Sequence, residues 1–225
     1  MSLDVVYLVR GGENEELRYS LRSLKNLPHG KVWMFGDPPD WVQNVQIVKG
    51  QEGVDKWQRA KSSLKKVVES GVSEDFILFN DDFFVMDEIQ EIPTITHGTL
   101  EEQYNLPKYK DVWGNLNTYA RILRSTEIQL GTYPTKNFDV HYPMVFNKER
   151  LKQVLLGHDS YIATRSFYGN FYRLDSVEAD DCKIYDSDTI PKNQTFISTT
   201  DGSFRGKTGD YIKQQFKEKS IYERD

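Results

Sequence analysis

The stretch Phe76-Ile-Leu-Phe79-Asn80-Asp81-Asp82-Phe83-Phe84 sets the interpretation of the whole chain. Its four apolar residues predict a strand that is buried on both faces. Asp81 and Asp82 follow directly, at the carboxyl end of the strand, where open α/β sheets bind their ligands. Two buried carboxylates repel each other, so a cation is their natural partner, and their hard oxygens suit Mg²⁺ or Mn²⁺. The alternative is a turn that ends the strand with solvated aspartates.

Strand and helix patterns alternate before this stretch. Short β-branched or aromatic runs predict strands at 4–9, 31–36 and 44–48, and amphipathic patterns predict helices at 13–26 and 54–70. This order predicts an α/β fold with a mainly parallel central sheet flanked by helices. A P-loop fold and a dinucleotide-binding fold are excluded, because neither Gly-Lys-Ser/Thr nor Gly-x-Gly-x-x-Gly occurs in the sequence.

The C-terminal half has a more irregular pattern. We expect an extended connection at 92–98, a short strand or turn at 139–143, a β-type run at 195–199 and a terminal helix at 208–217. Asn147 is a suitable N-cap for a helix of roughly ten residues. A helix at 108–127 is predicted from apolar residues at helical spacing, namely Val112, Trp113, Leu116, Tyr119, Ile122 and Leu123. We expect one domain over 1–225, with a nucleotide-binding half at 1–90 and an acceptor and catalytic half at 91–225.

The composition limits the protein class. The net charge of −5 and the lack of a long basic block count against a nucleic-acid or membrane partner. The single cysteine, Cys182, rules out an intrachain disulfide framework and suits a reducing compartment. No apolar stretch is long enough for a membrane span. We therefore expect a cytoplasmic protein with no stable membrane insertion.

Two arginines mark the first predicted helix. Arg18 and Arg22 are four residues apart and therefore lie on one helical face. Such a pair beside a strand, loop and helix unit can grip a diphosphate. The alternative is a pair of solvated arginines on an outer face.

Several of these motifs resemble those of the Stealth proteins. This family includes capsular-polysaccharide phosphotransferases and the lysosomal-enzyme N-acetylglucosamine-1-phosphotransferase. The resemblance is carried by Glu16-Leu-Arg18-Tyr-Ser-Leu-Arg22-Ser23, Phe79-Asn80-Asp81-Asp82-Phe83-Phe84, His141-Tyr-Pro143, Arg165 in Arg-Ser-Phe-Tyr-Gly-Asn, Phe196-Ile-Ser-Thr-Thr-Asp201 and Lys219-Ser-Ile-Tyr222-Glu223. The opening Asp4-Val-Val-Tyr7 also matches, but the usual Trp-Val-Asp continuation is replaced by Leu8-Val9-Arg10.

The resemblance implies a GT-A-like fold and a divalent metal, Mg²⁺ or Mn²⁺. It implies transfer of hexose-1-phosphate from a nucleoside diphosphate sugar to a hydroxyl of a glycan or similar acceptor. The site residues expected on this basis are Asp81 and Asp82 for the metal, Arg10, Arg18, Arg22 and Asn80 for the donor, and His141, Arg165 and Asp201 for catalysis.

Each catalytic role has an alternative. His141 is expected to take the proton of the acceptor hydroxyl, since histidine titrates near neutral pH. It can equally be a hydrogen-bonded structural residue, and His97 is a competing base. Arg165 is expected to stabilise the transferring phosphoryl group, or else to pack as a cation on its aromatic neighbours. Asp201 is a further candidate metal ligand.

Three other functions stay open. A glycosyltransferase would use the same fold and metal but move only the sugar and release a nucleoside diphosphate. A non-catalytic carbohydrate- or nucleotide-binding module would bind the donor without turnover. Glycosylation of a DNA base is the third, and the acidic balance counts against it.

Overall fold

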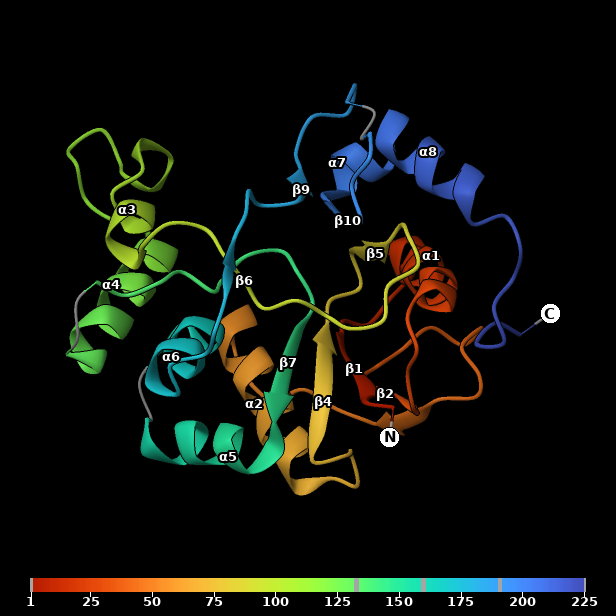
Figure 1. The fold of residues 1–225 in the computed structure, drawn as a ribbon, viewed down its shortest axis with the longest axis horizontal. Helices are drawn as coiled ribbons and strands as arrows, with labels where there is room; N and C mark the ends of the chain where they lie inside the picture. The colour runs from red at the N-terminus through yellow and green to blue at the C-terminus, as the bar shows by residue number, and fades with distance from the viewer. Residues whose placement is uncertain (1, 132–133, 159–160, 190–191, 225) are drawn as a thin grey trace. The chain divides into compact units, whose positions relative to one another are not determined.

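The computed structural model describes residues 2–131, 134–158, 161–189 and 192–224 (Figure 1). The chain forms two compact units. One comprises Met1–Ile92, His141–Lys148 and Cys182–Asp225, and the other Pro93–Val140 and Glu149–Asp181. The C-terminal segment therefore belongs with the N-terminal strands, so the two units do not follow the expected halves at 1–90 and 91–225.

A five-stranded sheet in the order β3-β2-β1-β4-β7 forms the centre of the first unit. Its strands are β1 (Asp4–Val9), β2 (Val32–Gly36), β3 (Gln46–Val48), β4 (Asp75–Phe79) and β7 (Met144–Asn147). The first four strands are parallel, and β7 runs antiparallel to β4. The predicted α/β fold with a mainly parallel central sheet is confirmed, and all four predicted strands of this sheet are present. The edge strand β7 was not predicted.

The helices of the first unit are α1 (Glu15–Ser23), its continuation η1 (Leu24–Asn26), α2 (Lys56–Glu69), α7 (Asp201–Phe204) and α8 (Lys207–Gln215). The helices α1 and α2 pack on this sheet because their apolar residues recur on one side, whereas the apolar residues of α7 and α8 join those of a second, smaller sheet. Leu17 and Leu21 of α1 join Val5 and Tyr7 of β1 in one buried cluster. Alternate residues of a strand point to opposite faces, so Val5 and Tyr7 define the face that α1 covers. The helix α2 contacts β1 and β2.

A second, smaller sheet continues from the end of β4. It has the order β5-β10-β9, with β5 (Phe83–Val85), β9 (Lys183–Ile184) and β10 (Phe196–Thr199). Strand β10 is antiparallel to β5 and parallel to β9. This pairing brings the residue after β10, Thr200, and the start of α7 close to the turn between β4 and β5.

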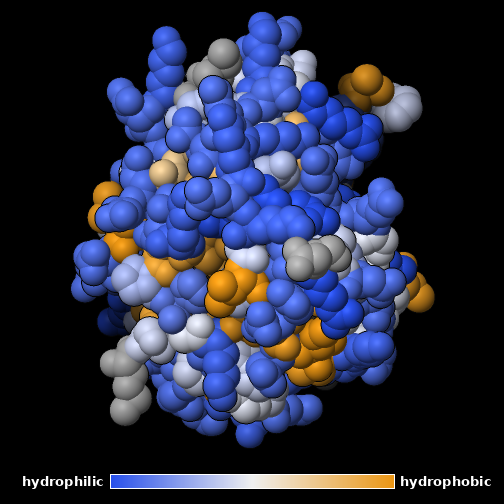
Figure 2. All heavy atoms as spheres, turned by 90° about the vertical axis from the view of Figure 1, so that its right-hand side faces the viewer, coloured by the Kyte–Doolittle hydropathy of each residue, from blue (hydrophilic) through white to orange (hydrophobic). Residues whose placement is uncertain are grey.

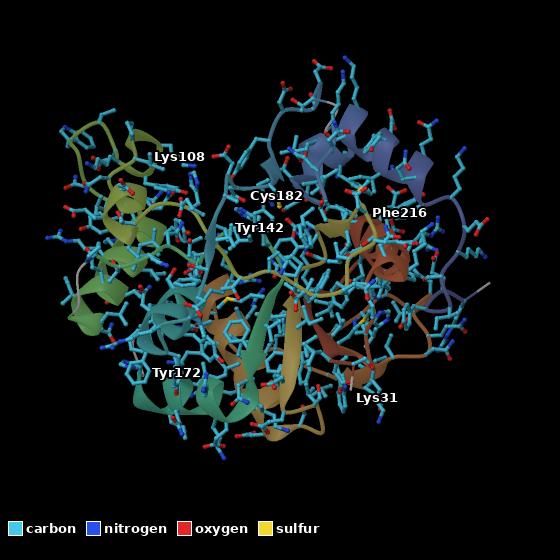
Figure 3. All side chains as sticks on the ribbon, in the orientation of Figure 1. Lys31, Lys108, Tyr142, Tyr172, Cys182 and Phe216 are labelled. Carbon is cyan, nitrogen blue, oxygen red and sulfur yellow. The ribbon has the colours of Figure 1, made fainter. Side chains whose placement is uncertain are left out.

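The segment before β7 is tied to this smaller sheet. The thiol of Cys182 donates a hydrogen bond to the backbone oxygen of His141 (2.8 Å). Tyr142 and Cys182 lie near each other (Figure 3), and the Tyr142 ring meets Phe196 of β10 edge-on, with 5.5 Å between ring centroids. The backbone oxygen of His141 is thereby bound to Cys182, which immediately precedes Lys183 in the sequence.

The second unit is mainly helical. It contains α3 (Leu100–Tyr104), η2 (Pro107–Tyr109), α4 (Thr118–Leu130), α6 (Thr164–Phe171) and, from Glu149 onward, α5 (Lys148–Gly157), with a two-stranded parallel sheet of β6 (Ile95–Thr96) and β8 (Val177–Glu178). The predicted helix that follows Asn147 and the terminal helix at 208–217 are confirmed.

The predicted helix at 108–127 is wrong in its first half. Residues between η2 and α4 form a loop that is closed by a bridge between Lys110 and Leu116. Gly114 has a φ of +82°, which a right-handed helix does not allow. The helix begins only after Asn117, whose side chain accepts the amide hydrogen of Ala120. Helical spacing of apolar residues therefore misled the prediction, and the capping residue marks the true start.

The face of the molecule drawn in Figure 2 is mostly hydrophilic, interrupted by small hydrophobic patches. Among the described residues, every helix is too short or too polar to cross a lipid bilayer.

Candidate active site

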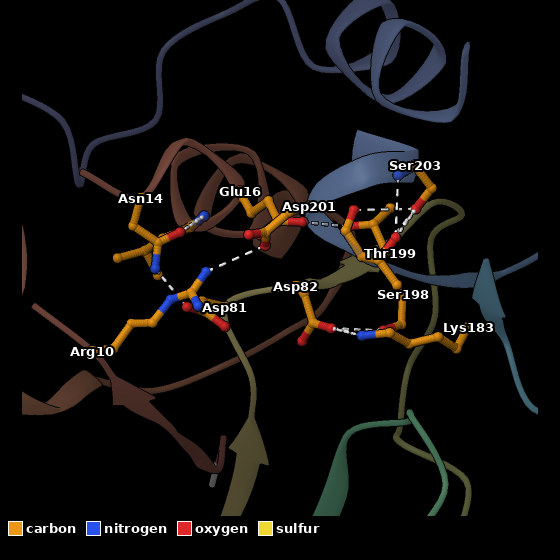
Figure 4. Close-up of polar contacts among 12 residues, drawn as sticks. Arg10, Asn14, Glu16, Asp81, Asp82, Lys183, Ser198, Thr199, Asp201 and Ser203 are labelled. Atoms are coloured by element: carbon orange, nitrogen blue, oxygen red, sulfur yellow. Dashed lines mark hydrogen bonds and ion pairs between the residues drawn. The ribbon is translucent and has the colours of Figure 1, made fainter. Parts of the chain in front are cut away.

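The turn between β4 and β5 holds Asp81 in contact with the start of α1. Nδ2 of Asn14 donates a hydrogen bond to Oδ2 of Asp81 at 2.5 Å (Figure 4). Oδ1 of the same Asn14 accepts the amide hydrogen of Leu17 at 3.0 Å and so caps α1. One side chain thus fixes both the helix terminus and the carboxylate.

Asp82 turns to the smaller sheet instead. Its Oδ2 accepts hydrogen bonds from Nζ of Lys183 (2.5 Å) and Oγ of Ser198 (2.9 Å), as Figure 4 shows. Its backbone oxygen accepts the amide hydrogen of Thr199 at 3.2 Å. The two neighbouring carboxylates therefore have different partners. Asp81 is bound at the start of α1, and Asp82 is bound by the smaller sheet.

Glu16 adds a third carboxylate from the first turn of α1. Oγ1 of Thr199 donates a hydrogen bond to its Oε1 at 2.8 Å, and the pair is buried. Burial and the negative charges of Asp82 and Asp81 raise the pKa of Glu16 to about 7, although the bond from Thr199 lowers it. Glu16 is therefore poised to gain or lose a proton near neutral pH.

Arg10 and Asp201 lie at the outer side of the same site. Arg10 follows β1, and Asp201 is the first residue of α7, after the capping residue Thr200. Their guanidinium and carboxylate groups form an exposed ion pair at 3.4 Å. The parallel arrangement of β1 and β4 places Arg10 and Asp81 at the same edge of the sheet.

The electrostatic state of Asp81 follows from these neighbours. Burial raises the pKa of Asp81, and the adjacent charge of Asp82 raises it further. The hydrogen bond from Asn14 and the charge of Arg10 act in the opposite direction. The pKa still lies above its ordinary value, so the negative charge on this carboxylate is undercompensated within the protein.

The carboxylates and Arg10 described above line one cavity of about 770 Å³. Its lining includes the predicted Arg10, Asn80, Asp81, Asp82 and Asp201, together with Glu16, Lys56, Arg59 and Lys183. The volume is in the range of small-molecule sites. Four carboxylates and four cationic side chains share its walls, an arrangement suited to a ligand that carries both phosphate groups and a metal ion.

A divalent metal fits this cavity only together with a ligand. No three His, Cys, Asp or Glu side chains of the described residues converge closely enough to hold a metal by themselves. The hydrogen bonds of Asp81 and Asp82 described above both use Oδ2, so Oδ1 of each takes no part in them. Mg²⁺ is commonly held by one or two carboxylates plus substrate phosphates and water. Burial and the charge of Asp82 raise the pKa of Asp81, and a bound cation would lower it.

Arg18 and Arg22 were predicted to bind the donor, and their contacts do not support that prediction. Nη1 of Arg18 lies 2.7 Å from Oε2 of Glu223. Nε and Nη2 of Arg22 bind Oε1 and Oε2 of Glu223 at 2.7 and 2.8 Å, and its Nη1 donates to the backbone oxygens of Phe216 and Lys217. Neither arginine lines the 770 Å³ cavity. These contacts join the C-terminal segment to α1, and donor binding by the two arginines stays a prediction.

The other predicted catalytic residues lie in different places. His141 belongs to the first unit, with its backbone joined to Cys182 beside Lys183. Arg165 lies in the first turn of α6 in the second unit. His97, the competing base, is also in the second unit, where Nδ1 contacts the backbone oxygen of Ala179 at 3.2 Å. The catalytic roles of His141 and Arg165 stay predictions.

Several side chains of the site were not predicted from the sequence, among them Lys56 and Arg59 in the cavity lining and Ser198 beside Asp82. Asn14, Glu16, Lys183 and Thr199 hold or line the carboxylate cluster. Asn14 carried a signal, since an asparagine before a helix predicts an N-cap. Lys183 carried none, because its position depends on a strand pairing between distant segments.

Comparison with known proteins gives only distant likeness. No protein-family model matches the chain, and its sequence matches no curated protein. Among solved structures it is similar to the bifunctional IspDF of Campylobacter jejuni, with 10% identity and a TM-score of 0.45, over 80% of this chain and 50% of that one. It thus spans about half the length of that enzyme.

Two further structures have a similar level of likeness. The galactosyltransferase LgtC, in complex with donor and acceptor sugar analogues, has 8% identity and a TM-score of 0.38 over 76% of this chain and 70% of its own. The 2-C-methyl-D-erythritol 4-phosphate cytidylyltransferase of Thermus thermophilus has 9% identity and a TM-score of 0.42 over 80% and 89%.

Proposed function

We propose that the chain is a metal-dependent transferase that uses a nucleoside diphosphate sugar and moves hexose-1-phosphate to a hydroxyl of a glycan or similar acceptor. The observation that carries the proposal is the shared cavity, in which Asp81 and Asp82 lie among basic side chains. A pyrophosphate with a dication complements both kinds of charge. The motifs shared with the Stealth proteins add support for transfer of the sugar phosphate rather than of the sugar alone.

The carboxylates would hold Mg²⁺ or Mn²⁺ against the donor. Asp81 and Asp82 supply ligand oxygens, Asn80 precedes them in the same turn, and Asp201 contributes from α7. When bound, the metal would supply positive charge that stabilises the phosphates of the leaving nucleotide. Asn14 and Ser198 would orient the two aspartates through the bonds to their Oδ2 atoms.

The basic side chains of the cavity would position the donor phosphates. Arg10, Lys56 and Arg59 are exposed in the cavity lining. Charged hydrogen bonds to phosphate oxygens fix the reacting phosphorus relative to the acceptor. Lys183 is already paired with Asp82, so it would tune the charge of that carboxylate rather than bind the donor.

His141 is our candidate for the general base. It would take the proton from the acceptor hydroxyl as that oxygen attacks the phosphorus. For Arg165, the resemblance implies the part of neutralising the transferring group. The motifs that resemble the Stealth family support both assignments.

The released nucleotide tests this proposal. The protein is incubated with a panel of nucleoside diphosphate sugars and candidate acceptors, with Mg²⁺ or Mn²⁺, and the nucleotide products are separated by chromatography. We expect a nucleoside monophosphate, because the β-phosphate leaves with the sugar. Release of a diphosphate would instead indicate transfer of the sugar alone.

Matched variants test whether the nucleotide product is formed by this protein or by a contaminating enzyme. Asp81→Asn should abolish the product, whereas Asp40→Asn, which changes an exposed aspartate outside the cavity lining, should leave it unchanged. No product from any donor over hours, with donor binding retained, would favour a non-catalytic binding module.

A further inference from the structure

Lys183 places a positive charge among the carboxylates of the 770 Å³ cavity. Its Nζ donates a hydrogen bond to Oδ2 of Asp82 at 2.5 Å, and both side chains are 14% exposed (Figure 4). The ion pair between Arg10 and Asp201, at the outer side of the site, is by contrast well exposed. Charges that are shielded from water are screened less, so they act more strongly on their surroundings. The charge of Lys183 therefore acts on any ion that approaches Asp82.

The smaller sheet determines where this charge lies. Strands β9 and β10 are parallel, with Lys183 opposite Ser198, so the two side chains lie on the same face of the sheet. Ser198 is also opposite Phe83 of β5, the residue that follows Asp82. Both side chains donate to the same carboxylate oxygen, Lys183 at 2.5 Å and Ser198 at 2.9 Å. The contact therefore depends on the pairing of three strands and is not a chance encounter between surface side chains.

The two neighbouring aspartates differ in how their charge is compensated. Asp81 accepts its hydrogen bond from the neutral amide of Asn14, whereas Asp82 accepts one from a full positive charge. A dication that bridged the two aspartates would offset the repulsion between them. It would also lie close to the ammonium group of Lys183, because that group shares the carboxylate of Asp82. Like charges at this range disfavour each other.

Phosphate groups change this balance of charge. A dication that enters by itself adds positive charge beside Lys183. A diphosphate that enters with the dication brings negative charge that balances it, so Lys183 can stay on Asp82. Among the residues that the structure describes, no three His, Cys, Asp or Glu side chains converge to hold a metal by themselves. This agrees with an ion that is held by one or two carboxylates together with phosphate oxygens.

We propose that Lys183 is the resident counter-ion of Asp82 and keeps a dication from binding until a diphosphate binds with it. Lys183 is a positioning residue in this scheme, since it acts through Asp82. The consequence is that metal and diphosphate bind together and neither binds well alone. The inference rests on the proposed metal site. The alternative is a structural lysine that only joins the smaller sheet to the turn between β4 and β5.

Binding of Mn²⁺ alone tests this inference without donor, acceptor or turnover. Metal-free protein is titrated with Mn²⁺, and the free ion is followed by its electron paramagnetic resonance signal. Lys183→Gln removes the charge but keeps a hydrogen-bond donor, and Lys183→Met removes both. Each variant should bind Mn²⁺ about tenfold or more tightly than the unmodified protein. A unit charge at this range changes the affinity of a site for a proton by about one to three powers of ten, and a dication feels the same charge more strongly.

Two control variants separate charge from structure. Lys183→Arg keeps the positive charge and should bind Mn²⁺ as the unmodified protein does. Lys207→Gln removes a lysine that pairs with Asp188 at 3.2 Å in the same unit, outside the cavity lining, and should also leave Mn²⁺ binding unchanged. A structural lysine predicts a different pattern, in which Lys183→Gln and Lys183→Met unfold at lower urea concentration without any gain in Mn²⁺ affinity.

Mn²⁺ binding by Lys183→Gln and Lys183→Met that is no tighter than that of the unmodified protein would overturn the inference. So would a gain in only one of the two variants when circular dichroism shows both folded, or an equal gain in Lys183→Arg. Calorimetric titration of pyrophosphate with Mg²⁺ keeps this result apart from a failure of the proposed function. If the unmodified protein binds pyrophosphate with Mg²⁺ while the variants gain no Mn²⁺ affinity, only the role of Lys183 fails. If pyrophosphate with Mg²⁺ does not bind either, the proposed function fails as well.

Discussion

Asn14 connects two parts of the site through one side-chain amide. Its oxygen caps α1 and its nitrogen binds Asp81. Replacement by alanine should lower the free energy of unfolding by about 1 kcal/mol through loss of the cap, and should also release Asp81. Asn14→Asp keeps the cap but places a second negative charge beside Asp81.

We therefore expect Asn14→Asp to retain most of the stability of the unmodified protein and still to bind the donor more weakly. Urea unfolding and calorimetric titration of the donor would measure the two effects separately. If Asn14→Asp bound the donor as well as the unmodified protein does, Asn14 would serve only as a helix cap.

Glu16 leads to a prediction of how the stability of the fold depends on pH. Its pKa is about 7 in the folded protein, above the ordinary value for glutamate. Between these two values the folded state binds more protons than the unfolded state, so this residue makes stability fall as pH rises, and the fall ends above about pH 7. In metal-free buffer, Glu16→Gln should remove this fall. Unfolding curves at several pH values would show the stability difference between variant and unmodified protein grow with pH; a constant difference would contradict the raised pKa.

At the scale of elements, the C-terminal segment is bound to α1 by one buried carboxylate. Burial raises the pKa of Glu223, but hydrogen bonds from Arg22, the Ser220 amide and Arg18 lower it to about 2. Its side chain is fully buried and that of Arg22 is 9% exposed. A pKa below the ordinary value means that the ion pair contributes stability above about pH 4.5, which is lost as pH falls towards 2.

Glu223→Gln should therefore destabilise the first unit by about 3–5 kcal/mol, because it leaves a buried guanidinium without its counter-charge. Thermal or urea unfolding at neutral pH measures this. Glu218→Gln, at an exposed position in the same segment, is the control and should have little effect. Equal stability of the two variants would show that the buried pair contributes nothing.

The elements that could be predicted are those defined by local pattern. Strands β1, β2 and β4 are short apolar runs between turn signals, and α2 has an amphipathic pattern after the N-cap Asp55. Strand β7 was missed because four residues after a proline carry too little pattern, and its pairing with β4 depends on distant sequence. The loop around Trp113 was missed because its apolar residues imitate helical spacing.

The site was predictable where a motif is local. Asp81, Asp82 and Asp201 each follow a strand, and the structure brings them to one cavity. Arg18 and Arg22 show the opposite case. Their spacing predicted an anion between them, and the anion is Glu223, about 200 residues away in the chain. The spacing of the two arginines predicted that their partner is an anion, but it did not indicate which residue supplies that anion.

At the scale of the whole molecule, the proposed donor site lies within a single unit. All the residues that line the 770 Å³ cavity belong to the first unit, although they come from its N-terminal strands and its C-terminal segment. A donor bound in this cavity would therefore require the two ends of the sequence to fold together.

The most direct test of the central claim is calorimetric titration of inorganic pyrophosphate into the protein with and without Mg²⁺. Pyrophosphate is the part that all nucleoside diphosphate donors share. We predict binding that requires the metal, that weakens about 100-fold or more in Asp81→Asn, and that is unchanged in Asp40→Asn. Pyrophosphate binding that is the same with and without Mg²⁺, or the same in Asp81→Asn as in the unmodified protein, would contradict the account.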